Sequence, residues 1–141
     1  MKEEYNILFI DDRDVDNFIV QMEIEHEEIP ITGRYEMSGE EALDFLATLK
    51  REEFPDVIMV DLNMPMMNGF EFVEEYTKLY NGSINDLPLI YILSSSIRTS
   101  DRERALNDVK ISNFFSKPFN KQMFEKVKQD YAAVIAKQEK V

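Results

Sequence analysis

Five residues spread along the chain carry side chains that could act together in one reaction. Asp11 and Asp12 follow the apolar run YNILFI, and Asp61 follows the apolar run DVIMV. Ser94 comes directly after LPLIYIL, and Lys117 comes just after SNFF. Each of these residues stands where a short apolar run ends, so their chemistry depends on how the runs are arranged.

Three neighbouring carboxylates would raise one another's pKa, because each negative charge disfavours ionisation of the others. A hard divalent cation such as Mg²⁺ favours the ionised forms and takes oxygen ligands of this kind. The ammonium of Lys117 and the hydroxyl of Ser94 add the charge and the hydrogen-bond donor that a tetrahedral anion needs. The set predicts a site for a phosphoryl group beside a metal ion.

A carboxylate can also act as a nucleophile and form an acyl phosphate. Asp61 is the candidate, because in the expected order of the strands it lies between the acid pair and the pair Ser94 and Lys117.

The apolar runs have the length of strands, and three of them lack the polar alternation of a half-exposed strand, which is typical of buried parallel strands. A fifth and more polar run fits an edge strand. The expected strands lie at 5–10, 30–37, 56–60, 87–93 and 112–115.

The segments between the strands have helical periodicity, and we expect their apolar stripes to cover the sheet. The first three stripes are Val15, Phe18, Ile19 and Met22, then Ala42, Leu43, Leu46 and Leu49, then Phe72, Val73, Tyr76 and Leu79. The last helix starts near Asn120 and carries Met123, Phe124, Val127, Tyr131, Val134 and Ile135. Ser38 with Glu41, and Ser100 with Glu103, have the spacing of reciprocal helix caps.

Five strands alternating with five helices predict parallel strands joined by right-handed crossovers. The expected fold is a three-layer α/β domain with a doubly wound parallel five-stranded sheet. In such sheets the ligand site lies at the carboxyl ends of the strands, which is where the five reactive residues stand.

Composition fits one domain over 1–141, with a core of about 4–136 and no second domain. The net charge of −12 disfavours nucleic acid and anionic lipid as partners. With no cysteine and a single histidine, His26, any metal would be held by oxygen. The sequence has no signal-peptide core and no apolar run of membrane-spanning length, so we expect a cytoplasmic protein.

The chain resembles the response-regulator receiver domains of two-component signalling, especially the stand-alone kind. The resemblance covers nearly the whole chain and rests on the acid pair Asp11-Asp12, Asp61 followed by MP and then Gly69, Ser94, and KPF from Lys117. It implies the flavodoxin-like (βα)5 fold.

The resemblance also implies the metal ligands. Asp12 and Asp61 would bind Mg²⁺ through their side chains, and Asn63 through its backbone carbonyl. Asp11 would act mainly through bound water. Asp61 would be the phosphoacceptor.

Four further roles come from the same resemblance. Lys117 would contact the phosphoryl group, and Ser94 would move to contact it, with Ser95 as the alternative hydroxyl. Phe114 stands at the aromatic switch position and lacks the phenolic hydroxyl of the more common tyrosine. A cis bond between Lys117 and Pro118 is expected to be accessible because proline lowers its free-energy cost.

By resemblance, the phosphoryl group comes from a sensor histidine kinase or a histidine phosphotransfer protein. Output would pass to a separate target protein through the fourth helix, fifth strand and fifth helix. The domain would assist its own phosphorylation and dephosphorylation without being an enzyme.

Two other functions compete with this interpretation. An aspartyl-nucleophile phosphatase usually carries a second acid two residues after the nucleophile, where this chain has Asn63. A receiver-like binding module would no longer take phosphate.

Three further residues are given structural roles. Asp14 and Asp16 are interpreted as first-turn helix acids, and Gly69 as a residue that permits close loop packing.

Overall fold

The computed structural model describes residues 2–80, 87–96 and 98–139, and it contains the expected parallel sheet. Its strands are β1 (Tyr5–Ile10), β2 (Ile31–Glu36), β3 (Val57–Val60), β4 (Leu89–Ser94) and β5 (Asn113–Ser116). They pair in parallel in the order β2-β1-β3-β4-β5. The polar β2 lies at an edge, as predicted, and β1 and β3 lie side by side at the centre.

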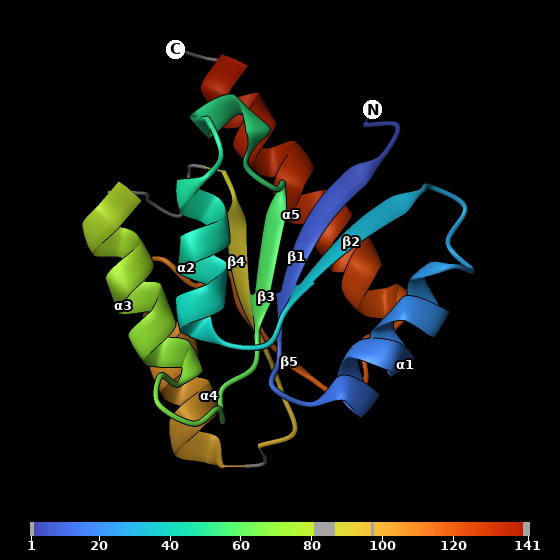
Figure 1. Cartoon of the computed structure of the whole chain (residues 1–141). Coiled ribbons are helices and arrows are strands. Elements are labelled where there is room, and N and C mark those ends of the chain that lie inside the picture. The colour runs from blue at the N-terminus through green and yellow to red at the C-terminus, as the bar shows by residue number, and fades with distance from the viewer. Residues whose placement is uncertain (1, 81–86, 97, 140–141) are drawn as a thin grey trace.

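Helices cover both faces of the sheet, which gives the three layers that the sequence predicts (Figure 1). They are α1 (Asp14–Ile24), α2 (Gly39–Ala47), α3 (Gly69–Tyr80), α4 (Thr99–Leu106) and α5 (Lys121–Glu139), with a short 3-10 turn, η1 (Arg51–Glu53). One apolar cluster joins the sheet to α2, α3 and α4, and a second joins its other face to α1 and α5. The fold is the doubly wound, three-layer α/β fold that the sequence predicts.

The central strands are buried because helices lie on both of their faces. Every residue of β3 and β4 is buried, and in β1 only Asn6 is exposed. Continuous apolar runs of this kind suit parallel strands between two helical layers. The rigid core therefore ends at Asp11, Asp61 and Ser94, where its strands emerge.

The predicted helix faces are confirmed for α2 and α5 and for most of α3. Ala42, Leu46, Phe72, Val73 and Tyr76 are buried as expected. The last position of the α3 stripe was wrong, since Leu79 is 60% exposed.

The prediction for α1 was wrong in its direction. Val15, Phe18, Ile19 and Met22 are all exposed, whereas Asn17, Val20 and Ile24 are buried. The helix has two apolar stripes, and the narrower one packs on the sheet. Periodicity alone favours the wider stripe, so the sequence pointed to the wrong face.

One of the two predicted helix caps is present. Ser38 Oγ accepts a hydrogen bond from Glu41 N at 3.1 Å, as expected for a capping serine. The predicted Ser100 cap was wrong, because α4 already begins at Thr99 and places Ser100 inside the helix. Instead, Ser96 Oγ accepts from Arg98 N at 3.3 Å, just before α4.

Candidate functional site

Three carboxylates converge at the carboxyl ends of β1 and β3. Asp11 and Asp12 follow β1, Asp61 follows the adjacent β3, and each offers a carboxylate oxygen within 4.8 Å of the others. Asp11 and Asp61 are buried, and Asp12 is half-buried. The structure thus brings together the three acids that the sequence singled out.

Lys117 reaches this cluster from the end of β5. Its Nζ lies 2.5 Å from Asp11 Oδ2, 3.0 Å from Asp16 Oδ2 and 3.5 Å from Asp61 Oδ1. All four side chains are less than one-fifth exposed, so bulk water screens these charges only weakly. A single ammonium offsets part of the negative charge of the acids around it.

Burial and charge shift the ionisation of both partners. Burial raises the pKa of Asp61 from 3.8 to about 6; the charge of Lys117 opposes this rise, and the charges of Asp11 and Asp12 add to it. Burial lowers the pKa of Lys117, but its hydrogen bonds to Asp11 and Asp16 and the charge of Asp61 outweigh burial and raise it. Asp61 is therefore a carboxylate held in a site where its charge is disfavoured.

The donor set fits a hard divalent cation. Among the described residues, the buried Asp12 Oδ1 has no hydrogen-bond partner. A buried carboxylate oxygen without a partner is unfavourable, and a bound cation would satisfy it. Three carboxylates and no nitrogen or sulfur ligand match the preference of Mg²⁺ for oxygen.

The backbone around the acids is held by local contacts. Asp11 Oδ1 accepts from Arg13 N at 3.0 Å, and the buried Asn17 donates its Nδ2–H to the Asp11 carbonyl at 3.1 Å. Gly69 lies so close to the Asp61 loop that an added Cβ would meet the Asp61 carbonyl oxygen at 2.7 Å. The interpretation of Gly69 as a residue needed for close packing is confirmed.

Ser94 is buried at the end of β4, whereas the next residue, Ser95, is exposed. Ser94 is fully buried, it pairs in register with Ser116, and its carbonyl accepts from Lys117 N at 2.9 Å. The Ser94 hydroxyl oxygen accepts from Ser96 N at 3.1 Å. The choice between Ser94 and Ser95 as the switch hydroxyl stays a prediction.

The two remaining switch positions lie on β5 and just after it. Phe114 is 3% exposed and packs in the cluster beneath α4, with the Arg102 guanidinium 5.8 Å from its ring centroid. Phe114 is therefore buried in this structure. The bond between Lys117 and Pro118, just after β5, is cis, as the sequence suggested.

Asn63 lies in the loop after β3, two residues beyond Asp61. Its side chain is exposed and lines a polar hollow of about 470 Å³ with Ser95, Ser96 and Arg98. Ser96 Oγ also donates to Asp101 Oδ2 at 2.6 Å across the start of α4. The role of the Asn63 carbonyl as a metal ligand stays a prediction.

The sequence analysis missed two residues of the site, Asp16 and Asn17. Asp16 was interpreted only as a first-turn acid; it is one, and it also pairs with Lys117. Both lie on the inward stripe of α1 with Val20 and Ile24. The signal was present in the sequence, because Asp16, Val20 and Ile24 recur every four residues.

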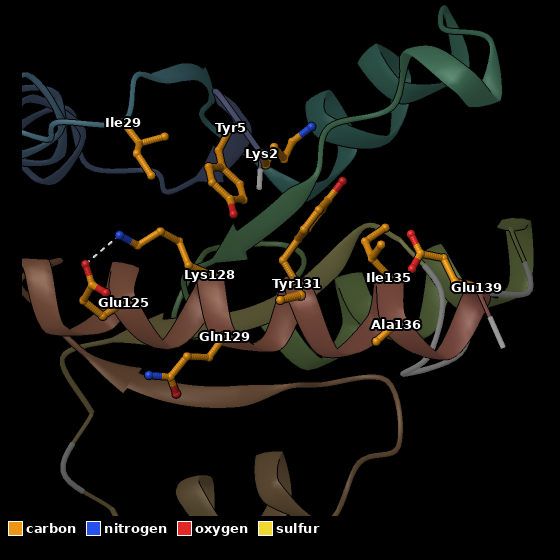
Figure 2. A pocket seen from close by; sticks show the side chains of 11 residues that line it. Lys2, Tyr5, Ile29, Glu125, Lys128, Gln129, Tyr131, Ile135, Ala136 and Glu139 are labelled. Carbon is orange, nitrogen blue, oxygen red and sulfur yellow. Dashed lines mark ion pairs between the residues drawn. The ribbon is translucent and has the colours of Figure 1, made fainter.

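A second hollow, of about 490 Å³, lies at the opposite end of the sheet (Figure 2). Tyr5 at the start of β1 and Tyr131 of α5 meet there edge to face, with ring centroids 5.4 Å apart. Lys128 and Glu125 form an ion pair of 2.6 Å at its border. Its lining is mainly apolar, in contrast to the acid cluster.

Among the described residues, no helix combines the length and the apolarity that crossing a membrane requires.

The sequence model of the family described as "Response regulator receiver domain" matches residues 7–128. The parallel sheet and its acid cluster define the same class of protein. The chain belongs to the receiver-domain family of two-component response regulators.

Curated relatives agree with this assignment. The chain is 32% identical over 117 residues to the sensor histidine kinase CheAY of Helicobacter pylori, covering 83% of this chain and 14% of that protein. It is 32% identical over 114 residues to the response regulator GtcR of Aneurinibacillus migulanus, covering 81% and 42%. The chain therefore spans less than half the length of these relatives.

Solved structures are similar over nearly the whole chain. A two-component response regulator from Cytophaga hutchinsonii superposes with a TM-score of 0.79 at 26% identity, covering 96% of this chain and 99% of that one. A response regulator receiver protein from Dyadobacter fermentans gives a TM-score of 0.76 at 26% identity, covering 89% and 96%.

Proposed function

We propose that this receiver domain accepts a phosphoryl group on Asp61 in a reaction that depends on Mg²⁺. The observation that carries the proposal is the position of Asp61, buried between two other acids with the Lys117 ammonium 3.5 Å away. A carboxylate with raised pKa beside a fixed cation and a cation-binding acid pair is suited to nucleophilic attack on a phosphoryl group.

The donor would be a phosphohistidine of a sensor histidine kinase or a phosphotransfer protein. An Asp61 Oδ atom forms the new bond to phosphorus, the bond from phosphorus to the histidine nitrogen breaks, and that nitrogen takes up a proton. Lys117 and Ser94 would bind the phosphoryl oxygens, while Asp12, Asp61 and the Asn63 carbonyl would hold the cation. Mg²⁺ would offset the negative charge that gathers on the transferred group.

The exposed stripe of α1 supports a docking role for this helix. Val15, Phe18, Ile19 and Met22 are each at least 44% exposed, beside the acids. Contiguous exposed apolar side chains of this kind are typical of contact surfaces. We propose that the phosphoryl donor docks on this stripe.

The output face would be formed by α4, β5 and α5. Leu106 and Val109 are 51% and 70% exposed at the end of α4 and in the loop that follows. Phe114 of β5 packs beneath α4, so a change at Lys117, three residues further on, can reach this face through β5. Phosphorylation would shift a pre-existing equilibrium of the face toward the form that binds a target protein.

The experiment measures the intact mass of the protein after incubation with acetyl phosphate and Mg²⁺. We expect a gain of one phosphoryl group that is stable in acid and labile in base, and no gain for Asp61→Asn. Absence of the gain in the wild-type protein would instead favour a binding module that takes no phosphate. Rapid release of phosphate over many turnovers would favour a phosphatase, although Asn63 replaces the second acid of such enzymes.

A cytoplasmic location of the protein stays a prediction.

A further inference from the structure

Lys117 Nζ lies within 3.5 Å of three carboxylates, and only one of them belongs to Asp61. An ammonium has three N–H donors. Two of them are used by Asp11 Oδ2 at 2.5 Å and Asp16 Oδ2 at 3.0 Å. Asp61 Oδ1, at 3.5 Å, is the most distant of the three acids. In this structure Lys117 is therefore held more closely by Asp11 and Asp16 than by Asp61.

Asp16 differs from the other two acids in its position. Asp11 and Asp61 belong to the group of three carboxylates that could hold a cation together, and Asp16 does not. It approaches Lys117 from the first turn of α1 and also lies 3.7 Å from Arg13 Nε. When a cation occupies the other acids, Asp16 remains a partner for the ammonium.

From this arrangement we infer that Asp16 is a positioning residue that draws Lys117 away from Asp61. This inference rests on the proposed function and adds a residue to it. Asp16 has two opposite effects on the site: it strengthens cation binding by the three acids, and it weakens the hold of Lys117 on a group attached to Asp61.

The first effect follows from competition between two cations. Lys117 and a divalent ion both interact with Asp11 and Asp61, so the ammonium opposes entry of the ion. Asp16 offsets the lysine charge and adds a negative charge of its own near the site. At a few ångströms in a partly buried site, such a charge is expected to change the dissociation constant of the ion about threefold or more.

The second effect follows from competition between two anions. A phosphoryl group on Asp61 needs an N–H donor of Lys117, and Asp16 already holds one. The stronger the pairing with Asp16, the smaller the gain when Lys117 turns toward the phosphoryl oxygens. Removal of the Asp16 charge should therefore favour the anion while it disfavours the metal.

A purely structural role predicts something different. If Asp16 only stabilised the start of α1 through the helix dipole, Asp14 would act in the same way, because both lie in the first turn. Asp14 is exposed, and its replacement removes the same charge from the same turn. Asp14→Asn is therefore the matched control for Asp16→Asn.

The test measures two dissociation constants in the full chain by NMR titration. The first is that of Mg²⁺ alone, and the second is that of trifluoroberyllate, a phosphoryl mimic, at saturating Mg²⁺. For Asp16→Asn we expect the constant for Mg²⁺ to rise about threefold or more and that for trifluoroberyllate to fall about threefold or more. Asp14→Asn should change each constant by less than about twofold. Asp16→Glu keeps the negative charge and should leave both constants near their wild-type values.

Two further measurements make the inference specific to Lys117. In a Lys117→Met background, Asp16→Asn should alter the affinity for trifluoroberyllate much less than it does in the wild-type protein, because only the direct effect of the Asp16 charge remains. A metal-free crystal structure of Asp16→Asn should show Lys117 Nζ at about 2.8 Å from an Asp61 carboxylate oxygen, the usual length of an ammonium–carboxylate hydrogen bond, and so closer than the present 3.5 Å. A lysine that stays at its present distance from Asp61 would contradict the inference.

Other outcomes separate the inference from the proposed function. If the wild-type protein binds trifluoroberyllate, and Asp16→Asn leaves both dissociation constants unchanged or raises both, only the inference is wrong. If the wild-type protein binds no trifluoroberyllate, the proposed function is wrong and the inference is wrong with it.

Discussion

Two aspartates flank β3, one at each end of the same buried strand. Asp56, before the strand, accepts a hydrogen bond from Asn6 N at 2.8 Å and lies 3.4 Å from Lys2 Nζ. Asp61, after the strand, is buried beside Asp11 and Asp12 and has Lys117 at 3.5 Å. Four residues of β3 separate a carboxylate with satisfied contacts from one surrounded by like charge.

The difference shows how the two ends of a parallel sheet diverge. At the amino end, the Asp56 carboxylate ties β3 to the backbone of β1, so its charge contributes to stability. At the carboxyl end, Asp61 is held where burial and neighbouring acids disfavour its charge, which is typical of sites that bind a ligand. The stabilising carboxylate and the proposed phosphoacceptor thus lie at opposite ends of one strand.

The sharpest way to break this comparison is to neutralise each acid in turn. We expect Asp61→Asn to abolish phosphoryl uptake from acetyl phosphate, because the nucleophilic oxygen is replaced by an amide. Asp56→Asn should retain uptake at the wild-type level, since Asp56 lies at the opposite end of β3. Intact mass after a fixed incubation with Mg²⁺ measures both. Equal loss in the two variants would mean that folding, not the site, was affected.

The pH dependence of stability should also separate the two ends. Asp61 has a pKa of about 6 in the folded protein and 3.8 ordinarily, so the folded state binds more protons between these values. The contribution of Asp61 to stability should therefore fall as pH rises from about 4 to 6, by about 3 kcal/mol at about 1.4 kcal/mol per pH unit.

Urea unfolding without metal, followed by circular dichroism, measures this dependence. Asp61→Asn lacks the titrating group, so at pH 7 it should be more stable relative to wild type than at pH 4. A difference between the two proteins that stays constant across this range would show that Asp61 does not carry the raised pKa.

Mg²⁺ should stabilise the folded protein only by binding at the carboxyl end of the sheet, where Asp61 lies. A ligand that binds the folded state stabilises it by about 2.7 kcal/mol at about a hundredfold excess over its dissociation constant. We expect a gain of this size for wild type and Asp56→Asn, measured by urea unfolding at pH 7, and little gain for Asp61→Asn. Sodium chloride at equal ionic strength controls for general screening, and an equal gain with Asp61→Asn would place the metal elsewhere.

The carboxyl end was largely predictable from the sequence. Continuous apolar runs identify the buried strands, and the strand order brings their last residues together, so Asp11, Asp61 and Lys117 could be assigned to one place. The direction of α1 was not predictable in the same way. Its wider apolar stripe, with Phe18 and Ile19, faces outward, and periodicity cannot distinguish a face that packs from a face that contacts a partner.

That single error also hid Asp16. With the wrong stripe of α1 facing the sheet, Asp16 has no reason to approach Lys117, and the helix dipole alone accounts for it. The contact joins residues 101 positions apart in the chain and depends on the rotation of a helix about its axis. Such contacts follow from tertiary packing, which local pattern does not encode.

The smallest expected effect concerns the amino end. Asp56→Ala removes the hydrogen bond to Asn6 N and the ion pair with Lys2, both at least partly open to solvent. Because the freed N–H of Asn6 can donate a hydrogen bond to water instead, the expected loss is about 1 kcal/mol in the free energy of unfolding. Urea unfolding at pH 7 without metal measures it, with Asp61→Asn beside it. The two variants should shift stability in opposite directions, Asp56→Ala downward and Asp61→Asn upward, because only Asp61 has charge that the fold opposes. A decrease in both would mean that Lys117 stabilises the charge of Asp61 more than burial opposes it.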